Sequence, residues 1–241
     1  SLKQYLPDAP VLRSLGRQFP VDVIYQAKAR SVLLGPRNRN LADLMANTIA
    51  AVITAAPSGE VVSSDNKLSS EPDSILCFLP GQAEIRRTKE QLEQKIRALG
   101  LNNVLVTPLY GDLKLEQQRA AIAPPAKGIR KIVLATDIAE SSLTIQGVNI
   151  VIDSGLRRSS AFDPNTSMSR LHTETISRAS SEQRAGRAGR IEPGVVYRLG
   201  SKQTFERRNS HDSPEILTSD ISQLMLEAKL WGADINELTL L

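Results

Sequence analysis

Short apolar runs alternate with stretches of helical spacing along most of this chain. The apolar runs predict strands at residues 21–25, 74–79, 104–107, 130–135, 148–152 and 195–199. Apolar residues spaced three or four apart predict helices at residues 41–53, 82–99, 115–122, 180–190 and 214–230. Strands that alternate with helices are typical of a parallel sheet with helices on both faces, so the predicted fold class is α/β.

Two segments interrupt this alternation. Residues 57–73 are rich in Ser, contain Pro and Gly, and have little apolar content, which predicts a surface loop without a role of its own. Residues 157–176 show no helical period and contain Pro164, so we expect a hairpin there. Asn40 precedes the first predicted helix and is a suitable N-cap.

Composition adds one uneven feature. Hydrophobic residues make up 41% of the 241 residues, which is enough to build a core, and the net charge of +4 is only mildly basic. The segment 157–198, however, holds eight Arg, no Lys and four acidic residues. An arginine cluster is by itself most often a solvated face, so it needs a motif before it indicates an anion site.

The single cysteine and the two histidines limit the chemistry. Cys77 lies in an apolar run, cannot form a disulfide within the chain, and is interpreted as a small core residue. The sequence therefore predicts no metal centre built from Cys and His. No apolar run has the length of a membrane span, so we expect no membrane partner. Because the chain begins with Ser1, we expect it to be a fragment.

The strongest motif is the octapeptide QRAGRAGR at residues 183–190. If this segment is helical, Gln183, Arg187 and Arg190 fall at i, i+4 and i+7 on one stripe. Two guanidinium groups pointing the same way form an anion clamp, since Arg matches phosphate oxygens with paired donors. Gly186 and Gly189 lie off the stripe, where the absence of a side chain is expected to let another backbone approach.

These residues resemble motif VI of superfamily 2 helicases, QRxGRxGR, and further segments extend the resemblance in the right order. They are GRQFPV at 16–21, SILCFLPGQAEI at 74–85, LYG at 109–111, RKIVLATDIAESSLTIQGVNIVIDSG at 130–155, and the strand after Pro193. The chain is thus similar to the C-terminal RecA-like lobe of DEAH-box RNA helicases. An isoleucine, Ile122, at the usual aromatic position and a compact region after LYG favour the HrpB type.

The resemblance implies a RecA-like domain at residues 21–212, a connector at 1–20, and the start of a helical domain at 213–241. No phosphate-binding loop, DExH or SAT motif is present, and in this family those belong to the first lobe. ATP with Mg²⁺ would therefore be bound mainly by that first lobe, and this chain alone is expected to be inactive. The implied partners are RNA and the first lobe, and the implied location is intracellular. The cytoplasm is the first choice, and an organelle stays open.

Candidate site residues follow from the matched motifs. The nucleotide phosphates would meet Gln183, Arg187 and Arg190, with one arginine acting as an arginine finger in catalysis. Other nucleotide contacts would come from Ser142, Thr144, Gln146 and Ile122. RNA backbone contacts would come from Gly81, Gly111, Thr136, Arg157, Arg158 and Arg170. Thr136 follows a buried strand, where small hydroxyls and free N–H groups suit phosphate.

Some assignments leave alternatives open. The family usually reads TNIAETS where this chain has TDIAESS, and Asp137 cannot donate the hydrogen bond that Asn would. Phe162 in the hairpin either stacks on a base or pins the hairpin to the domain. Two other functions also remain: a nucleic-acid-binding module without hydrolysis, and a lobe of a superfamily 2 DNA translocase.

The segment 57–73 yields the first test. Replacing it with a short Gly/Ser loop should leave the melting temperature nearly unchanged, because the segment has little apolar area to bury and loop length affects stability only slowly. Thermal melts of the two chains measure this, and a large drop in melting temperature would show that the segment packs on the domain.

Overall fold

The computed structural model describes residues 8, 10, 19–26, 41–55, 74–141, 145–163 and 165–233. The predicted loop at 57–73, the cap at Asn40, and the site residues Ser142 and Thr144 lie outside these ranges. Internal contacts divide the chain into two units. The larger comprises Gln18–Ser159 and Thr173–Asp212, and the smaller comprises Ser1–Arg17, Ser160–His172 and Ser213–Leu241. The predicted domain boundaries stay predictions.

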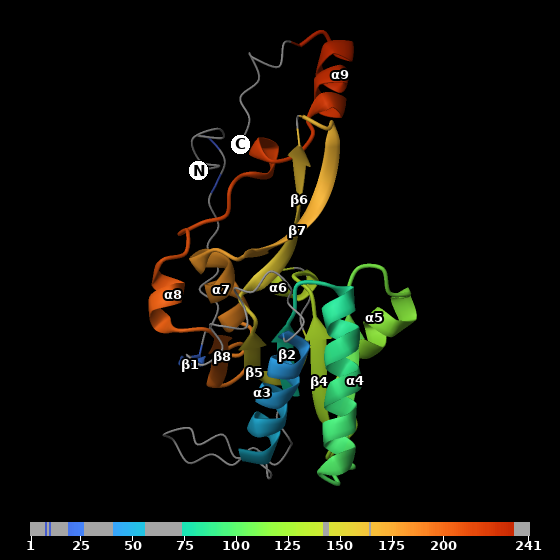
Figure 1. The fold of residues 1–241 in the computed structure, drawn as a ribbon, viewed down its shortest axis with the longest axis vertical. Helices are drawn as coiled ribbons and strands as arrows, with labels where there is room; N and C mark the ends of the chain where they lie inside the picture. The colour runs from blue at the N-terminus through green and yellow to red at the C-terminus, as the bar shows by residue number, and fades with distance from the viewer. Residues whose placement is uncertain are drawn as a thin grey trace. The chain divides into compact units, whose positions relative to one another are not determined.

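A six-stranded sheet forms the centre of the larger unit (Figure 1). All of its neighbouring strands pair in parallel. Their spatial order is β1 (Val21–Gln26), β8 (Gly194–Leu199), β5 (Val148–Asp153), β2 (Ser74–Phe78), β4 (Arg130–Ala135) and β3 (Val104–Leu109). Since β2, β4 and β5 are buried along their whole length, their apolar residues stand next to one another rather than alternating with exposed polar ones.

Helices cover both faces of this sheet, as predicted. On one face α3 (Leu41–Ala55) and α4 (Gln82–Ala98) pack on alternate strand residues such as Ile75 and Cys77. On the other face α5 (Leu115–Ile122), α6 (Ile138–Ser141) and α7 (Arg178–Ala185) pack on the residues in between, such as Leu76 and Phe78. The side-chain period of two thus assigns each strand residue to one of two cores. Cys77 is fully buried, as expected of a core residue.

The segment predicted as a hairpin forms two strands, β6 (Leu156–Asp163) and β7 (Met168–Thr175), which within the described part of the chain pair only with each other. A short helix that the pattern did not predict, α8 (Lys202–Glu206), follows β8. Among the described residues, no helix combines the length and apolarity that crossing a membrane requires.

The single helix predicted at 214–230 is wrong. A 3-10 turn, Glu215–Leu217, precedes a separate helix, α9 (Ser222–Leu230). Between them, the Asp220 carboxylate accepts a hydrogen bond of 2.9 Å from the Ser222 N–H. This local bond competes with continuation of the helix, as Asp side chains commonly do.

The helix predicted at 180–190 is also wrong in its bounds. It begins after Ser177, whose hydroxyl accepts a 3.1 Å bond from the Ser180 N–H, and it ends at Ala185. Beyond this point Arg187 bonds back to the Arg184 carbonyl at 3.1 Å, which is the tighter spacing of a 3-10 turn. The common helical stripe of Gln183, Arg187 and Arg190 therefore does not exist, and any grouping of the two arginines depends on this turn.

Close approach of another backbone occurs at Gly189 but not at Gly186. A Cβ at Gly189 would lie 2.6 Å from the Phe19 carbonyl oxygen and 2.7 Å from Val21 Cγ2. The Phe19 N–H also donates to the Gly189 carbonyl at 3.0 Å, so this contact fixes the entry to β1. At Gly186 the nearest atoms are at 3.5 Å, which is ordinary contact.

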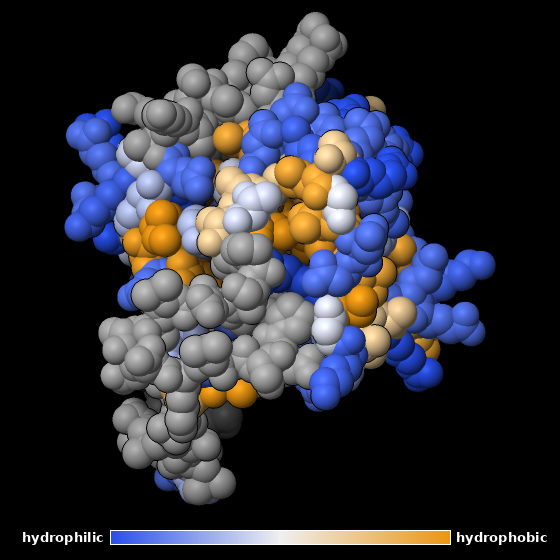
Figure 2. Space-filling view, turned by 90° about the horizontal axis from the view of Figure 1, so that it is seen from below, coloured by the Kyte–Doolittle hydropathy of each residue, from blue (hydrophilic) through white to orange (hydrophobic). Residues whose placement is uncertain are grey.

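Some apolar side chains of the larger unit are exposed. Figure 2 looks from below and shows hydrophobic side chains framed by hydrophilic ones. The larger unit's exposed apolar residues include Leu99, just after α4, and Leu105 on β3. Open parallel sheets bind ligands at the carboxyl ends of their strands, so a ligand site is expected at that edge.

Replacing Gly189 with Ala should destabilise the chain by about 1–3 kcal/mol, because the new methyl group overlaps backbone that cannot move independently. Gly186→Ala is the matched control and should stay within about 0.5 kcal/mol of the parent. Chemical denaturation measures both. Equal effects of the two substitutions would contradict the close-approach argument.

Candidate functional site

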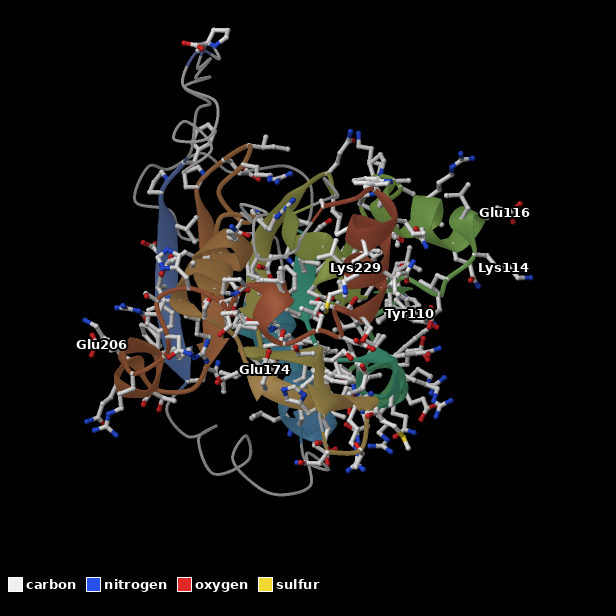
Figure 3. The ribbon with its side chains drawn as sticks, turned by 90° about the horizontal axis from the view of Figure 1, so that it is seen from above. Tyr110, Lys114, Glu116, Glu174, Glu206 and Lys229 are labelled. Atoms are coloured by element: carbon white, nitrogen blue, oxygen red, sulfur yellow. The ribbon has the colours of Figure 1, made fainter. Side chains whose placement is uncertain are left out.

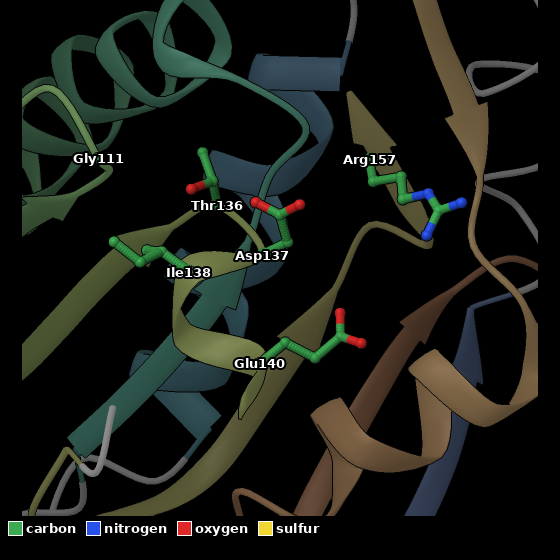
Figure 4. Close-up of a pocket in the computed structure, with 6 residues that line it drawn as sticks. All are labelled: Gly111, Thr136, Asp137, Ile138, Glu140 and Arg157. Carbon is green, nitrogen blue, oxygen red and sulfur yellow. The ribbon is translucent and has the colours of Figure 1, made fainter. Parts of the chain in front are cut away.

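Two neighbouring strands deliver predicted site residues to one edge of the sheet. Thr136 follows β4, and Gly111 comes two residues after β3. The Thr136 N–H donates to the Leu109 carbonyl at 3.2 Å, which holds these strand ends together. They border an open depression of about 470 Å³ (Figure 4). Its lining residues are Gly111, Thr136, Asp137, Ile138, Glu140 and Arg157.

Gly81 and Arg158 form a second part of this edge. Gly81 is the N-cap of α4, and a Cβ there would lie 3.2 Å from Arg158 Nη1. The exposed Arg158 side chain therefore lies across the glycine. Beside it, Gln82 Nε2 donates to the Tyr110 hydroxyl at 3.0 Å, joining the start of α4 to the segment after β3. Figure 3, seen from above, places Tyr110 far from Glu206, which belongs to α8 beyond β8.

Arg157 lines the depression but already has two acidic partners. Its Nε donates to Glu174 Oε1 at 2.8 Å, and its Nη1 lies 3.1 Å from Asp212 Oδ2. Burial disfavours the charge, but these two carboxylates outweigh it and raise the pKa of Arg157. A phosphate reaching Arg157 would have to compete with them.

The remaining hairpin residues lie in the smaller unit. Arg170 is exposed on β7. Phe162 is half-buried, and its N–H donates to the Thr218 carbonyl at 2.9 Å. This bond fixes the Phe162 backbone to the segment before α9. Whether its ring stacks on a base or pins the hairpin to the domain stays open.

Two arginines after α7, Arg187 and Arg190, lie near enough for their charges to interact. Gln183 and Arg190 are exposed, whereas Arg187 is only 6% exposed. Arg187 donates through Nε, at 2.9 Å, and through Nη2 to the main-chain carbonyl of Glu140. Burial and the neighbouring charge of Arg190 lower the pKa of Arg187, although Glu140 opposes the shift. Two like charges in this proximity favour an anion as ligand.

The other predicted nucleotide contacts are more scattered. Ile122 is the half-buried last residue of α5, and Gln146 is exposed in the turn before β5. The buried Lys131 donates through Nζ to the carbonyls of Ala120 and Ala123, on both sides of Ile122. Lys131 thus fixes the end of α5.

Sequence reasoning missed the buried group that holds these parts together. Arg184 is fully buried and packs over the Phe78 ring, 4.7 Å from its centroid. Its Nη1 lies 2.9 Å from Asp153 Oδ1, at the end of β5, and its Nε lies 2.9 Å from Glu140 Oε2 on α6. Ser181 Oγ adds a 3.0 Å bond to Asp153. One arginine therefore joins α7, α6 and β5.

The charge pattern contained a signal for this network. Arg184 is part of the same octapeptide, and Asp153 ends an apolar run in which an acid is unusual. Burial raises the pKa of Asp153, but Arg184, the Gly155 N–H and Arg208 together lower it below the ordinary value. Asp153 is thus held as a carboxylate inside the fold, and the charge of the segment 157–198 is partly internal rather than solvated.

The family described as helicase conserved C-terminal domain matches residues 60–192, more than half of the chain. The chain belongs to this family. Its sequence is 45% identical to the ATP-dependent RNA helicase HrpB of Escherichia coli K12, over 96% of this chain and 25% of HrpB. It is 41% identical to human ATP-dependent RNA helicase DHX30, over 66% of this chain and 13% of DHX30.

Solved structures agree with this assignment. The E. coli DExH-box NTPase HrpB is similar with a TM-score of 0.78 and 43% identity, covering 96% of this chain and 26% of HrpB. A second structure, of the E. coli DEAH/RHA helicase HrpB, is similar with a TM-score of 0.80. The predicted RecA-like fold and the resemblance to a C-terminal lobe of the HrpB type are confirmed. The chain spans about a quarter of the length of this relative.

For this helicase lobe, the described residues contain no group of three or more His, Cys, Asp or Glu side chains that could hold a metal ion.

Replacing Arg184 with Ala should destabilise the lobe by about 3–5 kcal/mol at neutral pH, because it leaves buried carboxylates without their cation. Arg178→Ala, an exposed position on the same helix, should change stability by less than about 0.5 kcal/mol. Denaturation curves measure both variants.

The pH dependence follows from the lowered pKa of Asp153. In the unfolded chain Asp153 has its ordinary pKa of 3.8, and above this pH its charge stabilises the folded parent fully. This stabilisation is lost as the pH falls through the lower pKa that Asp153 has in the folded state. Without Arg184, burial instead favours the protonated acid. The stability gap between parent and variant should therefore narrow as the pH is lowered toward about 4. A gap independent of pH would contradict this account.

Proposed function

We propose that this chain is the C-terminal lobe of an ATP-dependent RNA helicase, forming one wall of the nucleotide site and part of the RNA track. One observation carries the proposal: Arg187 and Arg190 lie close enough for their charges to interact, with Arg187 held on the Glu140 carbonyl. An arginine held on Glu140, with a second arginine charge nearby, suits an enzyme that uses a polyphosphate, and the strand-end depression that Glu140 also lines suits a nucleic acid. The whole activity belongs to a longer protein, since relatives such as HrpB are about four times as long.

At the nucleotide side, Arg187 and Arg190 would stabilise negative charge on the phosphates, one of them as an arginine finger. Burial and, after it, repulsion from Arg190 lower the pKa of Arg187, and an anion bound between the two arginines would offset that repulsion, which fits a polyphosphate. Bound ATP supplies the phosphoanhydride bond that is hydrolysed. Further nucleotide contacts are assigned to the following residues: Ile122, Ser142, Thr144, Gln146 and Gln183. The Mg²⁺ ligands and the remaining phosphate contacts are assigned to the first lobe.

At the nucleic-acid side, Thr136 and Gly111 line the depression and would contact the RNA backbone there. Arg158 presents an exposed charge beside Gly81, and Arg157 a charge shared with two acids. Arg170 would extend the phosphate contacts along the hairpin. RNA is the preferred strand because the relatives that match are named RNA helicases. An intracellular location, first of all the cytoplasm, follows from the same proposal.

In the full protein, Arg190→Ala should lower RNA-stimulated ATP hydrolysis by about 10³–10⁵-fold, the range for a transition-state arginine. Folding and RNA binding should be retained, because the side chain is exposed and exposed charges contribute little to stability. Arg207→Ala, exposed at the end of α8, is the control and should hydrolyse ATP like the parent.

The double variant Arg157→Ala, Arg158→Ala separates strand binding from hydrolysis. It should weaken RNA binding and flatten its salt dependence, since each lost phosphate contact removes counterion release. Turnover at saturating RNA should suffer less than in Arg190→Ala. Near-parental turnover in Arg190→Ala, or unfolding of that variant, would contradict the assignment of the arginine pair to the nucleotide.

A further inference from the structure

Glu140 contacts both sides of the proposed site. Its carboxylate lines the depression together with Arg157 (Figure 4). The same carboxylate accepts a 2.7 Å hydrogen bond from Ser180 Oγ and pairs with Arg184 Nε at 2.9 Å. Its main-chain carbonyl accepts two hydrogen bonds from Arg187. One residue thus reaches from the strand-end depression to the arginine pair.

The charge of Glu140 acts on arginines in both places. It favours the charged form of Arg157 in the depression, of the buried Arg184, and of Arg187 in the arginine pair. A phosphate that enters the depression brings a second negative charge close to this carboxylate and competes for Arg157. Occupancy of the depression therefore changes the electrostatic environment that holds Glu140 in place.

The backbone at Glu140 is constrained, so a displacement of its side chain is expected to displace its main chain as well. Helix α6 has only four residues, and the Glu140 N–H bonds back to the Asp137 carbonyl at 2.8 Å. Asp137 itself lines the depression. A shift at either the carboxylate or the start of α6 therefore moves the carbonyl on which Arg187 rests.

We propose that Glu140 is a positioning residue that couples occupancy of the depression by RNA to the placement of Arg187 at the nucleotide. This coupling rests on the proposed function. It goes further, because it assigns RNA stimulation of hydrolysis to one side chain and one carbonyl of α6.

The test is Glu140→Gln in the full protein, which keeps the size and one acceptor oxygen but removes the charge. The ratio of RNA-stimulated to basal ATP hydrolysis should fall about tenfold, within the range expected when coupling between two sites is lost. RNA affinity, measured by fluorescence anisotropy with a labelled oligonucleotide, should not weaken, because the removed charge is negative. Glu93→Gln on α4, whose ion pair with Lys89 is on the surface, is the matched control and should keep the parental ratio.

Ser180→Ala provides a second variant with the charge intact. It removes the 2.7 Å bond to Glu140 and should lower the ratio in the same direction by a smaller factor. Thermal melts of each variant identify any that do not fold, and Ser180→Ala then decides the question alone.

Each other outcome overturns the coupling in a distinct way. Equal losses of basal and stimulated hydrolysis would show that Glu140 only supports the structure. A weaker RNA affinity with an unchanged ratio at saturating RNA would make it a strand-binding residue. If the parent protein shows no RNA-stimulated hydrolysis, the proposed function itself fails, whereas stimulation that is equal in parent and variants removes only the coupling.

Discussion

A buried positive charge organises the larger unit. The Arg184 guanidinium is removed from water, which is costly unless it is paired and hydrogen-bonded. It is neutralised by Asp153 from the end of β5 and by Glu140 from α6, and it lies over the ring of Phe78 at the end of β2. Because breaking such a group leaves uncompensated charge in the interior, the relative positions of α6, α7 and these strand ends are narrowly fixed. Both sides of the candidate site are built on this arrangement.

Arginines in the arginine-rich segment 157–198 have three different roles. Arg184 is internal and stabilises the junction of elements. Arg157 is shared between the depression and two acids, so its charge is available only in competition with Glu174 and Asp212. Arg190 is exposed near Arg187 and suits an incoming anion. A net local charge does not distinguish these uses, because each depends on which carboxylates the fold brings within reach.

The position of α6 connects these uses. The segment from the end of β4 through α6 places Asp137 in the depression, the Glu140 carboxylate against α7, and the Glu140 carbonyl against Arg187. Short segments of this kind at the carboxyl edge of a parallel sheet are well suited to link two ligand sites, because few backbone bonds separate them. The physical link proposed here is therefore a consequence of sheet topology as much as of side-chain chemistry.

The sequence by itself determined the strands, the helices α3, α4 and α5, and the family. The apolar runs at 74–79, 130–135 and 148–152 indicated buried parallel strands, because both faces of such strands are covered. The octapeptide at 183–190 and the segment 130–155 pointed to the helicase lobe that the family match and the HrpB structures confirm. Only the tertiary structure showed that α7 ends at Ala185, that Gly189 meets the Phe19 backbone, and that Arg184 is the internal charge. Helical periodicity describes neighbours along one element, whereas these features depend on groups that are distant in sequence. Asp153 and Glu140 come within reach of Arg184 only when β5, α6 and α7 pack together.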